Sequence, residues 1–103
     1  MADPMKIRAT LVGDSTEVKA IISHEMETGQ RKDAAGKVIP GWFIQTVTAT
    51  HNGKNVLTAQ WGPAVAKNPF LSFKFKGGAK GDKIQITWVD NRGDKRTDEA
   101  LIA

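Results

Sequence analysis

The chain has 103 residues and no cysteine, and its fifteen Lys and Arg against eleven Asp and Glu give a formal net charge of +4. Without a thiol, disulfides, thiolate metal sites and cysteine nucleophiles are excluded. The length predicts one domain, residues 1–103, with a core sufficient for folding without covalent staples. The positive charge suits an anionic partner but does not choose between nucleic acid, protein and small anions.

The first residues of the sequence contain no apolar run long enough for a signal peptide. Nor does any segment approach the ~20 apolar residues of a membrane-spanning helix. We therefore expect a protein that has no export signal of its own and does not insert into a membrane.

Apolar and polar side chains alternate with a period of two along most of the chain, and no stretch repeats at the helical period. Such alternation predicts strands with one buried and one solvated face. In chain order, the predicted strands span 5–11, 17–22, 43–50, 54–61, 71–76, 83–88 and 95–102, the last as a polar edge strand. About seven short strands separated by Gly, Asn and Asp turns predict an all-β antiparallel sandwich.

The hairpin around Asn52-Gly53 can form in two registers. A two-residue turn at Asn52-Gly53 would pair His51 with Lys54 and would leave Phe43 and Trp61 on opposite faces. A type I turn followed by a left-handed bulge at Gly53 shifts the pairing by one residue. We favour the bulged register because it separates apolar from polar side chains. It places Phe43, Val47, Ala49, Leu57, Ala59 and Trp61 on one face, and Thr46, Thr48, Thr50, Lys54 and Thr58 on the other.

The densest group of chemically reactive side chains is SHEMETG, residues 23–29, with one imidazole and two carboxylates. A structural zinc site needs about four protein ligands and a catalytic one about three. The chain has only two histidines, His24 and His51, so neither a metal nor another cofactor is expected. Catalysis by His24 would also lack a nucleophile in any recognisable motif. This stretch is therefore predicted to be the end of a strand that runs into a polar loop.

The glycine-rich stretch GGAKG, residues 77–81, superficially resembles a phosphate-binding loop. It lacks the Lys-Ser or Lys-Thr ending of such loops and lies between two predicted strands rather than before a helix. We predict a flexible basic hairpin loop. Its lysine and those of the flanking strands are candidates for steering anionic partners: Lys74, Lys76, Lys80 and Lys83.

Nucleic-acid binding has the necessary charge but not the stacking surface. Proteins that bind single strands expose aromatic rings between basic side chains. Phe73, Phe75 and Trp88 instead alternate with polar or basic residues, so they are predicted to point into the core, with Trp42 as the most exposed tryptophan. A basic β-sandwich module that binds nucleic acid or another anionic protein is the alternative function.

Six stretches of unusual sequence follow one another along nearly the whole chain. They are RATL (8–11), SHEMETGQRKD (23–33), FIQTVTATHNGK (43–54), WGPAVAKNPF (61–70), FKFKGGAKGD (73–82) and WVDNRGD (88–94). Together they resemble the SoxZ family, the small subunits of the SoxYZ carrier complex of bacterial thiosulfate oxidation. Glu25 departs from the family pattern, in which proline is expected at that place.

The resemblance implies an immunoglobulin-like sandwich and a non-catalytic role. In this family the partner SoxY carries the sulfur intermediate on a cysteine of its mobile C-terminal tail, and other Sox proteins act on that adduct in turn. The resemblance thus implies a heterodimer with SoxY, or a heterotetramer, and transient contacts with other Sox proteins. It also implies a periplasmic location, reached by export together with a signal-bearing SoxY, and no binding to membranes or nucleic acid.

The long connection from Met26 to Pro40 is rich in charge and glycine, and long loops in small domains are often functional. We predict that this region docks the partner protein, because Met, Trp and Arg are enriched in interfaces. The predicted interface residues are His24, Met26, Glu27, Arg31, Lys32 and Trp42. The alternative is that this loop and the basic loop are merely solvated.

Overall fold

The computed structural model describes residues 4–62, 65 and 67–103. Its strands are β1 (Lys6–Val12), β2 (Ser15–Ile21), β3 (Ile44–His51), β4 (Lys54–Gln60), β5 (Phe70–Lys76), β6 (Lys83–Asp90) and β7 (Lys95–Leu101). Every strand pair is antiparallel. The described residues contain no helix, and hence none that could cross a membrane. The predicted all-β sandwich of about seven strands is confirmed.

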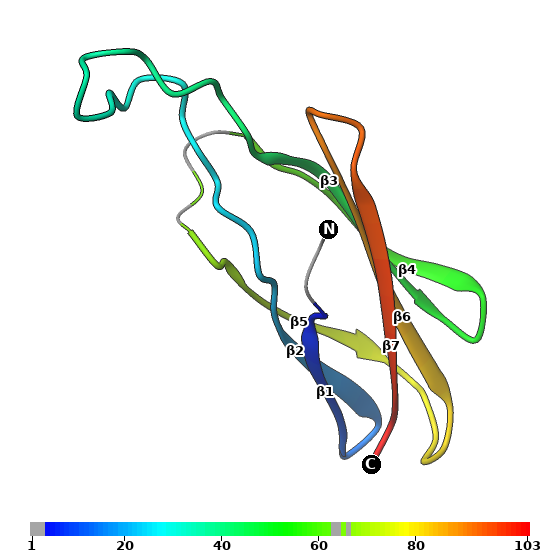
Figure 1. The fold of residues 1–103 in the computed structure, drawn as a ribbon. Coiled ribbons are helices and arrows are strands. Elements are labelled where there is room, and N and C mark those ends of the chain that lie inside the picture. The colour runs from blue at the N-terminus through cyan, green and yellow to red at the C-terminus, as the bar shows by residue number, and fades with distance from the viewer. Residues whose placement is uncertain (1–3, 63–64, 66) are drawn as a thin grey trace.

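The strands form two sheets that lie as two layers in Figure 1. One sheet has the strand order β1-β2-β5, and the other has the order β4-β3-β6-β7. The chain therefore changes sheet between β2 and β3, between β4 and β5, and between β5 and β6. This is the arrangement of an immunoglobulin-like sandwich in which the fourth strand lies beside the third.

The core lies between the two sheets, where alternate side chains of each strand meet. In β6, Ile84, Ile86 and Trp88 are buried, whereas the residues between them are partly exposed. The fully or largely buried apolar residues are Met5, Ala9, Val18, Ala20, Ile22, Met26, Ile44, Val47, Ala49, Leu71, Ile84, Ile86, Trp88 and Ile102. Because burying one large apolar side chain contributes about 1.5–3 kcal/mol, each strand is held in the orientation that its alternation predicts.

The hairpin between β3 and β4 combines features of both registers considered from the sequence. Beyond the turn, Ala49 pairs with Leu57, so the two side chains share one face, as the favoured register predicts. The turn itself, however, is a two-residue one, since Asn52 and Gly53 both have positive φ angles, 49° and 85°. The predicted bulge at Gly53 is therefore wrong: the register shifts farther along, where Val56 is the extra residue. As a result, Lys54 pairs with His51 and does not share a face with the threonines, contrary to the favoured register.

A second irregularity lies at the start of β3. The pairing of β3 with β6 shifts between Ile44 and Thr46. Ile44 is consequently completely buried, although its place in the alternation predicts an outward side chain. Phe43 and Trp61 are only partly buried and pack against the edge of the core.

The stretch 77–81 does not form the predicted hairpin loop, because β5 and β6 belong to different sheets. The stretch is instead a crossover, fixed by hydrogen bonds at both ends. The hydroxyl of Thr16 donates to the carbonyl of Gly77 at 2.7 Å, and the amide of Gly81 donates to the carbonyl of Ile102 at 2.8 Å. A Cβ at Gly78 would clash with the Thr16 hydroxyl, so the close approach requires glycine there.

Candidate functional site

The connection from residue 22 to residue 43, which we call the arm, projects beyond one end of the sandwich (Figure 1). It is an irregular hairpin rather than an open loop. The backbone amide of Glu27 donates to the carbonyl of Trp42 at 2.6 Å, and the amide of Trp42 donates back at 3.0 Å. Farther out, Lys32 and Val38 form a second isolated bridge. The predicted polar loop is thus an ordered extension with its own hydrogen bonds.

Asp33 organises the tip of the arm. Its carboxylate accepts hydrogen bonds from the backbone amides of Ala35 at 2.9 Å and Lys37 at 3.0 Å. Its carbonyl accepts from the amide of Gly36 at 3.0 Å, and Gly36 has a positive φ of 81° that suits glycine in a tight turn. All residues from 30 to 38 are exposed. The tip therefore has a defined backbone and a solvent-facing set of side chains.

A buried carboxylate holds the base of the arm. Oδ2 of Asp90, at the end of β6, lies 3.0 Å from Nε2 of His24 and accepts a hydrogen bond from the indole Nε1 of Trp42 at 2.8 Å. The side chains of His24 and Asp90 are 2% and 0% exposed. Because His24 lies at the beginning of the arm and Trp42 at its end, one carboxylate joins both ends to the sandwich.

The hydrogen bonds of His24 determine which ring nitrogen carries the proton. The amide of Met26 donates to Nδ1 at 3.1 Å, so Nδ1 is an acceptor. Nε2 must then carry the hydrogen and donate it to Asp90. The ring is also enclosed by Trp42 and Trp88, whose centroids lie 5.0 Å and 5.1 Å away. Both nitrogens are thereby occupied, which leaves the imidazole in a structural role.

Met26 takes a backbone conformation that is unusual for a residue with a side chain, with a φ of 52°. Its amide bonds to His24, and its sulfur accepts a hydrogen bond from the amide of Ile44 at 3.4 Å. These contacts, together with burial, hold the turn by which the chain enters the arm. Glu25, where the family pattern has proline, lies just before this turn, and its carboxylate pairs with Lys67 at 3.3 Å.

Asp90 receives hydrogen bonds on both oxygens. Oδ1 accepts from the backbone amides of Arg92 at 2.9 Å and Asp94 at 3.0 Å, in the turn between β6 and β7. Burial by itself would raise the pKa of Asp90. The donors on His24, Trp42 and the turn amides outweigh that effect and lower the pKa below its ordinary value of 3.8. The anchor is therefore a stable carboxylate at neutral pH.

The residues that follow Asp90 hold the outgoing strand of the arm. The side chain of Asn91 donates to the carbonyl of Gly41 at 2.9 Å and accepts from the amide of Phe43 at 2.9 Å. The guanidinium carbon of Arg92 lies 4.4 Å from the ring centroid of Trp42, a cation–π contact. The sequence marks these residues only as part of a turn between two strands, within the stretch 88–94 that resembles the SoxZ family. It gives no sign of their contacts with the arm.

A hollow of about 400 Å³ lies at the side of the arm, lined by Glu25, Met26, Glu27, Thr28, Arg31 and Lys67. Its cations are already paired: Arg31 makes two hydrogen bonds to Glu27, at 3.0 Å and 2.7 Å, and Lys67 pairs with Glu25. The hydrogen bond from Arg31 is the main cause of a lowered pKa of Glu27. The hollow thus offers a neutralised surface rather than an anion site.

The predicted interface residues fall into two groups. His24 and Met26 are 6% and 4% exposed, so they can support a contact only through the backbone that they hold. Glu27 and Trp42 are partly exposed, and Arg31 and Lys32 are exposed on the arm. The structure therefore places four of the six side chains where a partner could touch them.

The predicted steering lysines do not form one group. Lys74 and Lys76 lie on the outer face of β5, whereas Lys80 lies in the crossover to β6. Lys83 begins β6, and its ammonium lies 3.6 Å from Glu99. Only the first two share a sheet face.

His51, the second histidine, lies at the end of β3 that is farthest from the arm. Its Nε2 is 2.7 Å from Oδ2 of Asp82, and its ring centroid is 5.0 Å from that of Phe75. Across the described part of the chain, no group of three or more His, Cys, Asp or Glu side chains is arranged to hold a metal ion. Each histidine instead pairs with one aspartate and ties a connection to the sandwich.

Comparison with models of known protein families gives a match over residues 5–101, to the family described as sulphur oxidation protein SoxZ. The matched region contains all seven strands, the arm and the turn that holds it. Comparison with curated proteins gave no match.

Proposed function

Because the chain belongs to the SoxZ family of sulphur oxidation proteins, we propose that it is the non-catalytic subunit of a SoxYZ carrier complex and that the arm docks SoxY. SoxY would carry the sulfur intermediates on its cysteine. This chain would help to present that cysteine to the enzymes of sulfur oxidation.

The observation that supports docking by the arm is its combination of exposure and order. Arg31, Lys32 and Val38 are exposed, and Val38 keeps 54% of its accessible surface. The backbone that bears them is fixed by the two bridges and by the Asp90 anchor. A surface that is already ordered loses less conformational entropy on binding, so more of the contact energy appears as affinity.

Two further observations support a non-catalytic role. The sequence contains no cysteine that could carry a sulfur adduct. The imidazole of His24, the most reactive group of the arm, uses both nitrogens in internal contacts. A general base must reach the proton that it removes, and a buried ring with two occupied nitrogens does not.

The family resemblance extends the proposal to assembly and location. We infer a heterodimer with SoxY, or a heterotetramer of two such pairs, that contacts other Sox proteins transiently. The complex would work in the periplasm, exported under the signal of SoxY. Cell fractionation with and without that signal on SoxY tests the proposed export. Loss of the signal should keep both subunits in the cytoplasm.

Mass spectrometry of the reconstituted complex after thiosulfate turnover tests the proposed division of roles. Sulfur adducts should appear on the SoxY cysteine and not on this chain. A covalent sulfur adduct on this chain, or turnover by this chain alone that is lost in His24→Ala with the fold intact, would overturn the proposal.

A further inference from the structure

The outer face of the β1-β2-β5 sheet presents its side chains in rows across three strands. Lys6 pairs with Ile21, which pairs with Phe70, and this row lies at the end of the sheet from which the arm starts. The next row contains Arg8, Lys19 and Ser72. The remaining outward side chains are Thr10, Glu17, Lys74, Val12, Ser15 and Lys76.

Positive charge is concentrated on this face. Its outward side chains include five cations, Lys6, Arg8, Lys19, Lys74 and Lys76, and one carboxylate, Glu17. The excess of four positive charges is as large as the formal net charge of the whole chain. Glu17 pairs with Lys19 at 3.2 Å, whereas the other four cations have no ion pair with any residue that the structure describes. Such a field attracts acidic surfaces.

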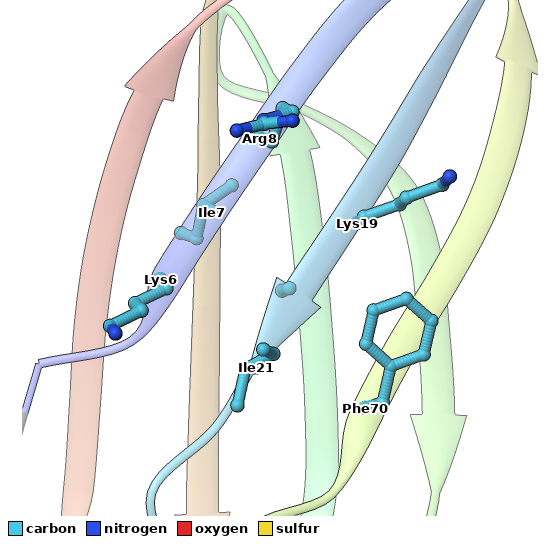
Figure 2. Close-up of a pocket in the computed structure, with 7 residues that line it drawn as sticks. Lys6, Ile7, Arg8, Lys19, Ile21 and Phe70 are labelled. Carbon is cyan, nitrogen blue, oxygen red and sulfur yellow. The ribbon is translucent and has the colours of Figure 1, made fainter.

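Three large apolar side chains are exposed on the charged face: Val12 at one end, and Ile21 and Phe70 together at the other. Ile21 and Phe70 are 46% and 59% exposed, and they are direct cross-strand neighbours. A hollow of about 350 Å³ lies beside them, and Lys6, Arg8 and Lys19 contribute to its lining. Figure 2 shows Phe70 and Ile21 on adjoining strands with these three basic side chains around them. An apolar centre with a charged rim is the usual composition of a protein-binding patch.

The outer face of the other sheet lacks this combination. A row of four threonines, Thr58, Thr48, Thr87 and Thr97, crosses all of its strands. The lysine at one end of β6, Lys83, is paired with Glu99. That face also exposes Leu101, at 63%, beside Lys83. Because this lysine is already paired, the described residues give that face no apolar pair among unpaired cations.

We propose that this face docks an acidic segment of a partner protein, with one apolar side chain of the segment against Ile21 and Phe70 and its carboxylates on Lys6, Arg8 and Lys19. The face lies on the sheet and not on the arm, so this contact is additional to the proposed docking of SoxY. A single-stranded nucleic acid fits less well, because successive bases need successive aromatic rings. Phe70 is the one aromatic on this face, since Phe73 and Phe75 point inward.

Nuclear magnetic resonance titration of the isotopically labelled full chain tests the proposal. The probe is a short synthetic peptide of aspartates and glutamates around a central leucine. A second peptide has serine in place of the leucine, and an oligothymidylate serves as the nucleic-acid probe. Shift changes with the first peptide should cluster on Lys6, Arg8, Lys19, Ile21 and Phe70.

Phe70→Ser and Arg8→Glu should each weaken binding of the first peptide about tenfold or more, because central anchors carry most of the affinity of such patches. Two control variants, Leu101→Ser and Lys95→Glu, change one exposed apolar and one exposed basic side chain on β7. Both should leave binding of the first peptide unchanged. The spectra themselves report whether each variant is folded.

Three outcomes would overturn the proposal. Shift changes that are absent or lie elsewhere would show that the face does not bind such a segment. Equal binding of the leucine and serine peptides would remove the apolar anchor and leave only charge attraction. Tighter binding of the oligothymidylate on the same residues would assign the face to nucleic acid instead.

Discussion

The imidazole of His24 and the carboxylate of Asp90 meet at 3.0 Å in the protein interior, although 66 residues separate them in the chain. The indole of Trp42 bonds to the same carboxylate oxygen. These contacts fix the start and the end of the arm to one point at the end of β6. The position of the exposed arm is therefore set by a buried carboxylate.

Asp90→Asn should loosen the arm and lower the free energy of unfolding. The amide that replaces one carboxylate oxygen cannot accept hydrogen bonds, so buried donors lose their acceptor, at a cost of about 1–3 kcal/mol. Chemical denaturation measures the loss. Asp94→Asn is the matched control, since Asp94 is an exposed carboxylate of the same turn. Equal stability of the two variants would show that the buried carboxylate does not anchor the arm.

The stability provided by Asp90 should depend on pH in one direction. Its pKa is lowered on folding, so its contribution is complete above the ordinary value of 3.8 and is lost as pH falls through the lowered value. Denaturation of the parent and of Asp90→Asn should therefore converge in stability below about pH 4. A difference between the two proteins that persists unchanged as pH falls well below 3.8 would contradict the assignment.

Trp88 and Trp61 both contact the core, but they should contribute differently to the free energy of unfolding. Trp88 is 1% exposed, whereas Trp61 is only partly buried. Trp88→Ala should cost about 3–5 kcal/mol, as truncation of a buried aromatic residue does, and Trp61→Ala should cost less. Urea denaturation of both variants gives the comparison. An equal or larger loss for Trp61→Ala would mean that the hairpin packs in a different register.

The period-two alternation was sufficient to predict the strands and most of their faces. In β5 and β6, all of the side chains predicted to point inward do so: Leu71, Phe73, Phe75, Ile84, Ile86 and Trp88. The reason is that sidedness in a strand is a local property, fixed by the backbone and by the burial of one face. The same argument correctly placed Ala49 and Leu57 on one face of their hairpin.

The positions of the two bulges could not be predicted in the same way. Asn52-Gly53 forms the two-residue turn that its sequence suits, and the extra residue is Val56 instead of Gly53. At the start of β3, the shift beside Ile44 turns that residue inward. A bulge is placed by packing between strands, and the local sequence does not contain that packing.

The buried contacts that anchor the arm could not be predicted from the sequence. The sequence predicts His24 at the end of a strand and as an interface residue, whereas its side chain is buried. Its partners Asp90 and Asn68 come from distant segments, and the amide of His24 donates to the side chain of Asn68 at 3.1 Å. Contacts of this kind follow from the fold as a whole and leave no periodic pattern in the sequence.

The kinetics of binding to purified SoxY should separate the arm from the basic residues. Trp42→Ala and Arg31→Ala should speed dissociation, because side chains at a packed contact act mainly on the dissociation rate. Met26→Ala should do the same indirectly, through the backbone that Met26 holds. Lys76→Ala and Lys80→Ala should slow association and weaken its salt dependence, as steering charges do.

Lys95→Ala serves as the control for these kinetics, since Lys95 is an exposed lysine of β7. Surface plasmon resonance gives both rate constants for each variant. If all of the arm variants leave the dissociation rate unchanged while remaining folded, the docking surface lies elsewhere on the sandwich.

Hydrogen–deuterium exchange of the chain, with and without SoxY, tests docking by the arm most directly. Residues 30–38 are exposed in the free chain. The amides of Arg31, Lys32, Ala34 and Val38 have no acceptor among the described residues, so these four should exchange quickly. Bound SoxY should slow exchange across the arm and leave β4, Lys54–Gln60, unchanged. Slowed exchange on a sheet face or edge, with the arm as fast as in the free chain, would contradict the account.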